Sequence, residues 1–131
     1  MLRPLIAIDL NSRVGKASIS RLISRVLKVF GIADVIFIMD DNSIVEFNES
    51  KVFPISDSDS VTSLVENLKK LSEKRDALDL ESVLKLKREL RRSILIVVSD
   101  REVRSEREMI FRFNGKKITK VSLGIQNVSQ H

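Results

Sequence analysis

Several residue types that particular functions require are scarce or missing in this chain. It has no cysteine, which excludes disulfide bonds and zinc sites built from thiolates. Its single histidine, His131, is the last residue, so a Ser–His–Asp triad or a histidine-rich metal site cannot be built. There is no Trp or Tyr and only six Phe, which is few for a protein that stacks single-stranded bases on aromatic side chains.

Long apolar runs are also missing. The longest purely apolar stretches are about five or six residues, whereas a helix that crosses a bilayer needs roughly 20. Residues 1–10 lack the charged, apolar and small-residue regions of a signal peptide. We therefore expect a soluble, intracellular and cytoplasmic protein that does not contact membranes.

The composition that is present fits one compact domain. The 131 residues are 43% apolar and 31% charged, which is the balance of a globular protein. We expect a single domain over residues 1–131, with its core in about 5–125 and a tail at 126–131. The net charge of +5 and the isoelectric point near 9.7 favour contacts with acidic partners, nucleic acid included.

The pattern of apolar residues predicts alternating strands and helices. Continuous apolar runs predict strands at 5–9, 35–39, 44–47, 94–99 and 118–125. Apolar residues at helical spacing predict helices at 14–30, 61–71, about 80–92 and 105–115. The turn residues at 40–43 make a β-hairpin of the second and third strands.

This order of elements predicts an α/β fold and the place of its site. We expect a three-layer α-β-α sandwich with a mainly parallel central sheet and one antiparallel hairpin strand at an edge. In such sheets, ligands bind outside the carboxyl ends of the strands, near the point where the strand order reverses. Asp9 and Asp100 stand at the carboxyl ends of the first and fourth predicted strands, so they mark the candidate site.

Two enzymatic interpretations of this site are open. The stretch "NSRVGKAS" resembles part of a phosphate-binding P-loop, but its leading glycine is absent and Ala17 stands where a hydroxyl should follow the lysine. Asp9, Asp79 and Asp100 are the candidate ligands of a metal-dependent hydrolase, because two-metal hydrolysis needs several carboxylates.

The pattern of the whole chain resembles the von Willebrand factor type A (VWA) family. Matching stretches follow one another over about residues 5–125: "IAIDLNSR", "VIFIMDDNSIVEF", "RDALDLESVLKL", "ILIVVSD" and "ITKVSLGI". In that family the first strand ends in Asp-x-Ser-x-Ser, a β-hairpin and a Gly-Gly-Thr-Asp-Leu loop follow, and a later strand ends in Asp. The resemblance implies a Rossmann-like fold and a role in binding proteins.

The resemblance also implies a metal-ion-dependent adhesion site that binds Mg²⁺ through hard oxygen ligands. Asp9 and Asp100 match its carboxylates, and Asn11 replaces its first serine. Arg13 and Leu78 stand where a serine and a threonine should be, so we expect a degenerate site, with Mg²⁺ the only cofactor suggested. We expect the guanidinium of Arg13 to pair with Asp9 or Asp100 in place of the metal's charge.

We therefore predict a non-enzymatic module that binds a protein partner through its strand-end loops, residues 9–16, 75–79 and 100–105. The side chains expected at this contact are Arg13, Lys16, Asp79 and Arg101. The alternative is a nucleic-acid-binding protein whose basic helix faces contact phosphates. Its candidate residues are Lys85, Arg88, Arg92, Lys116 and Lys117.

Overall fold

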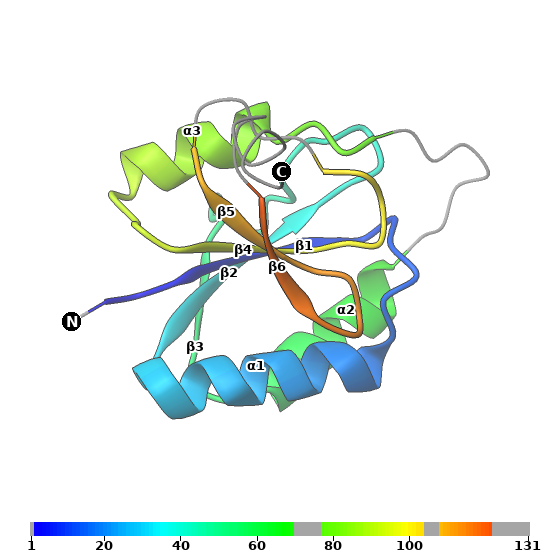
Figure 1. Cartoon of the computed structure of the whole chain (residues 1–131), viewed down its shortest axis with the longest axis vertical. Helices are drawn as coiled ribbons and strands as arrows, with labels where there is room; N and C mark the ends of the chain where they lie inside the picture. The colour runs from blue at the N-terminus through cyan, green and yellow to red at the C-terminus, as the bar shows by residue number, and fades with distance from the viewer. Residues whose placement is uncertain (1, 70–76, 104–107, 122–131) are drawn as a thin grey trace, which may run out of the picture.

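The computed structural model describes residues 2–69, 77–103 and 108–121. Within these ranges the chain has an α/β fold (Figure 1). Its strands are β1 (Leu5–Asp9), β2 (Ala33–Ile38), β3 (Phe53–Ile55), β4 (Leu95–Val98), β5 (Ile110–Phe113) and β6 (Ile118–Val121). Its helices are α1 (Lys16–Phe30), α2 (Asp59–Leu68) and α3 (Glu81–Glu89). None of these helices is long and apolar enough to span a membrane.

The strands form one mixed sheet in the order β3-β2-β1-β4-β5-β6. β1 is parallel to both β2 and β4, and β4 is parallel to β5, whereas β3 and β6 run antiparallel at the two edges. The prediction of a single antiparallel strand is therefore wrong, because each edge has one. The strand order reverses between β1 and β4, so their carboxyl ends meet where α/β sheets usually bind ligands.

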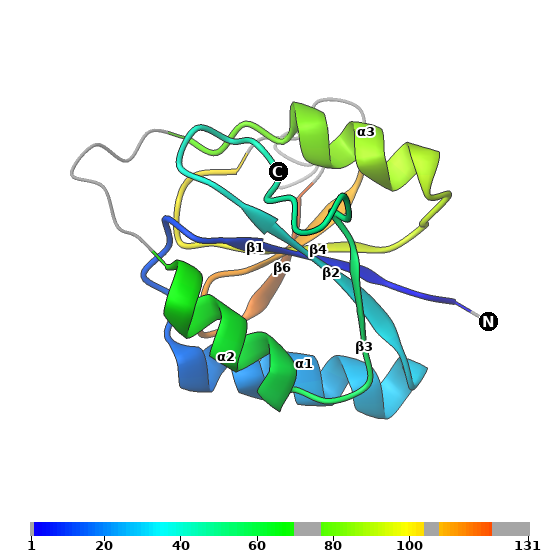
Figure 2. The ribbon, with the colours of Figure 1, turned by 180° about the vertical axis from the view of Figure 1, so that it is seen from behind.

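Successive residues of the central strands point into two separate cores. Ile6 and Ile8 of β1 lie in the core that α1 and α2 cover, whereas Leu5 and Ala7 lie in the core that α3 covers. Figures 1 and 2 accordingly show α1 and α2 on one side of the sheet and α3 on the other. Because every residue of β1 is buried, the strand is held in place and fixes the position of Asp9 and of the start of the loop that follows.

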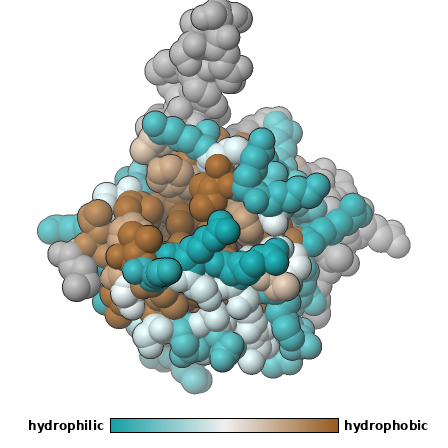
Figure 3. Space-filling view, turned by 60° about the horizontal axis from the view of Figure 1, so that its bottom comes forward, coloured by the Kyte–Doolittle hydropathy of each residue, from teal (hydrophilic) through white to brown (hydrophobic). Residues whose placement is uncertain are grey.

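α1 buries one face and exposes the other. The buried face has helical spacing and consists of Ile19, Leu22, Ile23 and Val26. Gly31, with a φ of 81°, ends the helix, and its N–H donates to the carbonyl of Leu27 at 2.7 Å. Figure 3 shows long hydrophilic side chains on this side of the molecule next to an apolar area.

The antiparallel partner of β2 differs from the prediction. Residues 44–47 form no strand, and one isolated bridge joins Ile44 to Ile38. Asn48 and Glu49 both adopt positive φ values, of 48° and 66°, and they turn the chain before the pairing can extend. The chain then returns as β3, which pairs with the start of β2 and forms this edge of the sheet.

The predicted helix at 105–115 is wrong where the structure describes it, because this region contains β5. Phe111 and Phe113 contribute to the α1-side core and Ile110 to the α3-side core, an alternation that suits a strand. Gly115, with a φ of 103°, lies in the turn to β6 instead of ending a helix. The sheet consequently has six strands where the sequence pattern predicted five.

The remaining predicted elements are present with shifted ends. α2 begins two residues before the predicted position 61, and α3 ends at Glu89, shortly before Arg91 with its positive φ of 56°. Residues 70–76, 104–107 and 122–131 lie outside the described residues. They include the end of the predicted second helix, parts of two strand-end loops, the end of the last predicted strand and the predicted tail.

Candidate functional site

Asp9 lies buried at the carboxyl end of β1, and its carboxylate accepts four hydrogen bonds. Its Oδ1 accepts from the backbone N–H of Asn11 at 2.9 Å and from Nη2 of Arg101 at 2.8 Å. Its Oδ2 accepts from the hydroxyl of Ser99 at 2.6 Å and from Nε of Arg101 at 2.7 Å. A carboxylate has about four lone-pair directions, so these donors use its full capacity.

Arg101 is the positively charged partner of Asp9. Its side chain, like that of Asp9, is almost completely buried, and the two groups form a bidentate pair. The loop that carries Arg101 is held locally, because its backbone N–H donates to the hydroxyl of Ser99 at 3.0 Å. Bidentate charge-assisted hydrogen bonds are among the strongest in proteins, and this pair offsets the cost of burying two charges.

A second group of hydrogen bonds joins the loop after β1 to the loop after β4. The buried hydroxyl of Ser12 accepts from the N–H of Val14 at 3.0 Å and from the N–H of Asp100 at 3.3 Å. The carboxylate of Asp100 accepts from the backbone N–H of Arg13 at 3.1 Å. Backbone groups of both loops are therefore held across the switch point of the sheet.

The residues at this site do not fit a divalent cation at Asp9. A hard cation needs several free oxygen ligands, whereas both oxygens of Asp9 already accept hydrogen bonds and Arg101 supplies a positive charge. No group of three or more His, Cys, Asp or Glu in the described ranges could hold a metal ion. The expected pairing of Arg13 is also wrong: Arg101 is the arginine that pairs with Asp9, and Arg13 contacts Asp100 through its backbone amide.

The predicted contact residues have different surroundings. Arg13 and Lys16 are exposed, and Lys16 forms a surface ion pair with Glu66 at 3.2 Å. Asp79 is exposed too, and its Oδ1 accepts from the N–H of Glu81 at 2.9 Å, in the first turn of α3. Arg101 is instead buried against Asp9, so it is not part of the exposed surface of these loops.

The turn between β5 and β6 reaches the same edge of the sheet. The N–H of Ser99 donates to the carbonyl of Phe113 at 3.0 Å. A Cβ atom built on Gly115 would lie 3.7 Å from Cγ1 of Val14, so the turn packs beside the loop after β1. Lys116 and Lys117, predicted as nucleic-acid contacts, are exposed in this turn. The structure thus brings them to the edge that also presents Arg13 and Lys16.

The basic face predicted for the helix at about 80–92 is partly neutralised by ion pairs within the chain. Arg88 lies 2.7 Å from a carboxylate oxygen of Glu108, and Arg92 lies 2.7 Å from one of Asp34. Glu108 also accepts from Lys87 at 2.8 Å. This bond with Lys87, supported by Arg88, holds the pKa of Glu108 below its ordinary value. These charges are neutralised within the chain, so α3 is a weak candidate for contacting phosphates.

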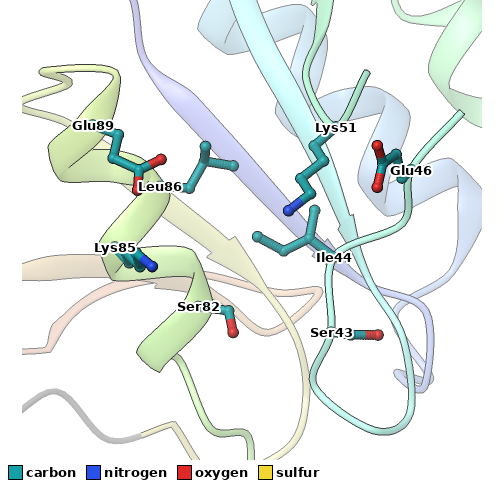
Figure 4. A pocket seen from close by; sticks show the side chains of 8 residues that line it. All are labelled: Ser43, Ile44, Glu46, Lys51, Ser82, Lys85, Leu86 and Glu89. Carbon is teal, nitrogen blue, oxygen red and sulfur yellow. The ribbon is translucent and has the colours of Figure 1, made fainter. Parts of the chain in front are cut away.

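Lys85 belongs to a cavity of about 330 Å³ between α3 and residues 43–51 (Figure 4). The lining residues are Ser43, Ile44, Glu46, Lys51, Ser82, Lys85, Leu86 and Glu89. Figure 4 shows Lys51 and Lys85 on opposite walls, with a glutamate near each of these walls. Two acids balance two bases here, which does not favour a polyanion such as nucleic acid.

Sequence reasoning pointed to this sheet edge, but it assigned no role to Ser12 or Ser99 and did not pair Arg101, which it predicted as an exposed contact residue, with Asp9. The register that pairs Ile8 with Val98 places Asp9 and Ser99 next to each other. Knowledge of that register would have pointed to the Ser99 hydroxyl as a donor. Comparison with known proteins adds no further constraint, since no family model, curated protein or solved structure matches this chain.

Proposed function

We propose that this chain is a VWA-like, non-enzymatic interaction module, a three-layer α-β-α sandwich that binds an acidic protein partner through its strand-end loops. The order of the elements supports the fold part, since a strand ending on an aspartate is followed by a helix and the sheet has an antiparallel edge strand beside β2. The helices on both sides of the sheet support it as well (Figures 1 and 2).

The buried Asp9–Arg101 pair is the observation that carries the proposal. The resemblance assigns this position to a metal, and here a guanidinium of the same chain occupies both carboxylate oxygens. Asp9 therefore has no free lone pair with which to hold a cation. Asp79 makes a local bond in α3, which argues against a hydrolase built on Asp9, Asp79 and Asp100.

The exposed side chains of the edge indicate the charge of the partner. Among the described residues, four exposed basic side chains lie there, those of Arg13, Lys16, Lys116 and Lys117, of which Lys16 is paired with Glu66. The backbone that carries them is held by hydrogen bonds of Ser12 and Asn114, so the charges are presented from ordered loops. A pre-organised positive surface favours an acidic partner and speeds its association.

The test is affinity capture from an extract of the source cells, followed by binding measurements with the purified captured protein. Arg13→Glu combined with Lys116→Glu is expected to weaken the affinity by about tenfold or more, because like charges then oppose the partner. Lys51→Glu combined with Lys85→Glu makes the same change of net charge on the α3 side and is the matched control. Equal binding by the two double variants would contradict the proposal.

Nucleic-acid binding through this edge is the second candidate, because the same four basic side chains could contact phosphates. Duplex DNA binding that falls by orders of magnitude between about 50 and 200 mM salt, and that the loop double variant loses, would favour this candidate. Retention of the protein partner at the higher salt concentration, without measurable DNA binding, favours the first.

A further inference from the structure

Two segments that border the α1-side core, α1 and the β5–β6 hairpin, carry no negative charge, whereas α2 on the same side carries Asp59 and Glu66, and Glu66 pairs with Lys16. α1 contributes Lys16, Arg21, Arg25 and Lys28, and the β5–β6 hairpin contributes Lys116, Lys117 and Lys120. Neither segment contains Asp or Glu, although the whole chain has 18 of these residues. Positive charge is therefore more concentrated in these two segments than the net charge of +5 suggests.

Apolar side chains lie between these basic residues. Leu27 and Phe30 of α1, Ile94 before β4 and Phe111 of β5 are only partly buried at the margin of the α1-side core. Ile118 of β6 is 47% exposed. These five residues are called the apolar strip below, and Figure 3 shows apolar side chains gathered on this side, bordered by long hydrophilic ones.

The pairing of β5 with β6 sets which side chains join the strip. Ile118 is opposite Phe113, and Lys120 is opposite Phe111. Residues opposite each other in an antiparallel pair lie on the same face of the sheet. Since Phe113 belongs to the α1-side core, Ile118 and Lys120 face that side as well. On this face of β6, the exposed apolar side chain of Ile118 is therefore followed by the basic side chain of Lys120.

We propose that the apolar strip binds an amphipathic helix of a partner protein, one with an apolar stripe flanked by Glu and Asp. A helix of this kind buries its stripe against apolar side chains, while its flanking acids meet the basic side chains of α1 and of the β5–β6 hairpin, which together form the basic border of the strip. The apolar strip itself is a different surface from the strand-end loops, although Lys16, Lys116 and Lys117 belong both to its basic border and to the edge that those loops form. The contact with the strip does not depend on the proposed role of the loops.

Other occupants suit this surface less well. Nucleic acid would engage the basic border but leave the apolar strip unused, because phosphate contacts are polar. A second copy in a two-fold contact would place the basic border against itself, and the like charges would repel. A flat bilayer reaches partly buried side chains poorly, and four of the five residues in the strip are partly buried.

The probe is a fluorescein-labelled 18-residue peptide with Leu on one helical face and Glu beside it, titrated with the full chain. Saturable binding is expected, and Ile118→Asp is expected to weaken it by about tenfold or more, because it places an acid in the apolar contact. Arg25→Glu is expected to weaken it by a smaller factor, and a matched Leu/Lys peptide is expected not to bind.

Lys51→Glu is the charge control for Arg25→Glu, since both substitutions change the net charge equally and Lys51 lies on the other side of the sheet. Ile118→Gln replaces Ile118→Asp if circular dichroism shows that the aspartate variant does not fold. The proposal is overturned by peptide binding that neither substitution of Ile118 weakens, or by no peptide binding at all. Binding of duplex DNA or phosphatidylserine vesicles in place of the peptide, or a dimer that Ile118→Asp dissociates, would also overturn it.

Discussion

Each end of the sheet holds one buried aspartate among arginines, and the two arrangements differ in alignment and exposure. At the carboxyl end, the side chains of Asp9 and Arg101 are 0% and 4% exposed and form two aligned hydrogen bonds. At the amino end, the buried Asp34 lies between Arg3 and Arg92, whose side chains are 32% and 23% exposed.

The geometry at the amino end is looser. Oδ1 of Asp34 accepts a hydrogen bond from Nη2 of Arg3 at 2.9 Å. Nε of Arg3 and Nη2 of Arg92 lie 2.8 and 2.7 Å from Oδ2, distances typical of ion pairs, but they are not aligned as hydrogen bonds. The cluster joins residues at the starts of three neighbouring strands, β1, β2 and β4, while both arginines keep contact with water.

This difference shows at which end of the sheet the buried charges are fully enclosed and paired within the protein. A charge that remains partly hydrated can exchange its partner at little cost, whereas a fully buried pair cannot. The carboxyl end, where ligands usually bind in α/β sheets, is the end with the enclosed pair. If this edge binds a partner as proposed, the exposed side chains of the loops above the pair would make the contact, and not the pair itself.

The largest effect is expected from breaking the enclosed pair. Asp9→Asn removes the countercharge of a guanidinium that cannot reach water, so the free energy of unfolding should fall by about 3–5 kcal/mol. Urea unfolding followed by circular dichroism measures it. Adding Arg101→Leu to Asp9→Asn removes the buried positive charge as well and should recover part of the loss. A loss below about 1 kcal/mol in the single variant would mean that the pair is not enclosed.

The same substitution at the other end gives a direct comparison. Asp34→Asn leaves Arg3 and Arg92 without a countercharge, but both can turn toward water, so a loss of about 1–2 kcal/mol is expected. The same urea titration, run beside that of Asp9→Asn, gives the difference. If the two variants lose equal stability, exposure of the arginines is not what distinguishes the two ends.

Glu108 is a third acid that lies among basic residues, on the α3 side of the sheet. Its contribution to the free energy of unfolding is expected to depend on pH. Its pKa is lowered in the folded state from an ordinary value of 4.5, chiefly by the hydrogen bond from Lys87. A lowered folded pKa adds stability above the unfolded pKa, and this stability is lost as the pH falls through the folded pKa. Glu108→Gln should therefore cost about 1 kcal/mol or less near neutral pH.

Unfolding of wild type and Glu108→Gln is compared across a pH series that runs from neutral to well below 4.5. The difference in unfolding free energy should shrink steadily in the acid part of the series. A difference that stays constant there would mean that Glu108 acts through packing and not through its charge. Glu89→Gln, on α3 next to Lys87 and Arg88, is the matched control.

The sequence predicted most of the centre of this fold because the central elements have strong local patterns. β1 is a continuous apolar run and α1 has four buried residues at helical spacing, so neither needs knowledge of the rest of the chain. β5 has four residues, too few to show its period, and its pairing with β4 is not local. The strand predicted at 44–47 was wrong for the same reason, since its apolar pattern could not show where the pairing with the neighbouring strand stops.

For the candidate site, the sequence likewise indicates the acids at the strand ends but not their partners. Asp9 and Asp100 follow directly from the ends of predicted strands, a property that the chain order reveals. The choice between Arg13 and Arg101 as the partner of Asp9 depends on where each side chain points once β1 and β4 are adjacent. One arginine is exposed and the other buried, and no pattern in the sequence distinguishes them.

The smallest effect is expected from Mg²⁺, and it tests the enclosed pair without any substitution. Binding to Asp9 would require breaking the pair with Arg101, at a cost of several kcal/mol that a cation with few free ligands does not recover. Addition of Mg²⁺ at constant ionic strength should therefore leave the thermal unfolding midpoint of wild type unchanged within about 1 °C. A concentration-dependent rise that Asp9→Asn abolishes would show that the guanidinium yields to the metal. The carboxyl end would then be a regulated cation site, and the contrast between the two ends of the sheet would no longer hold.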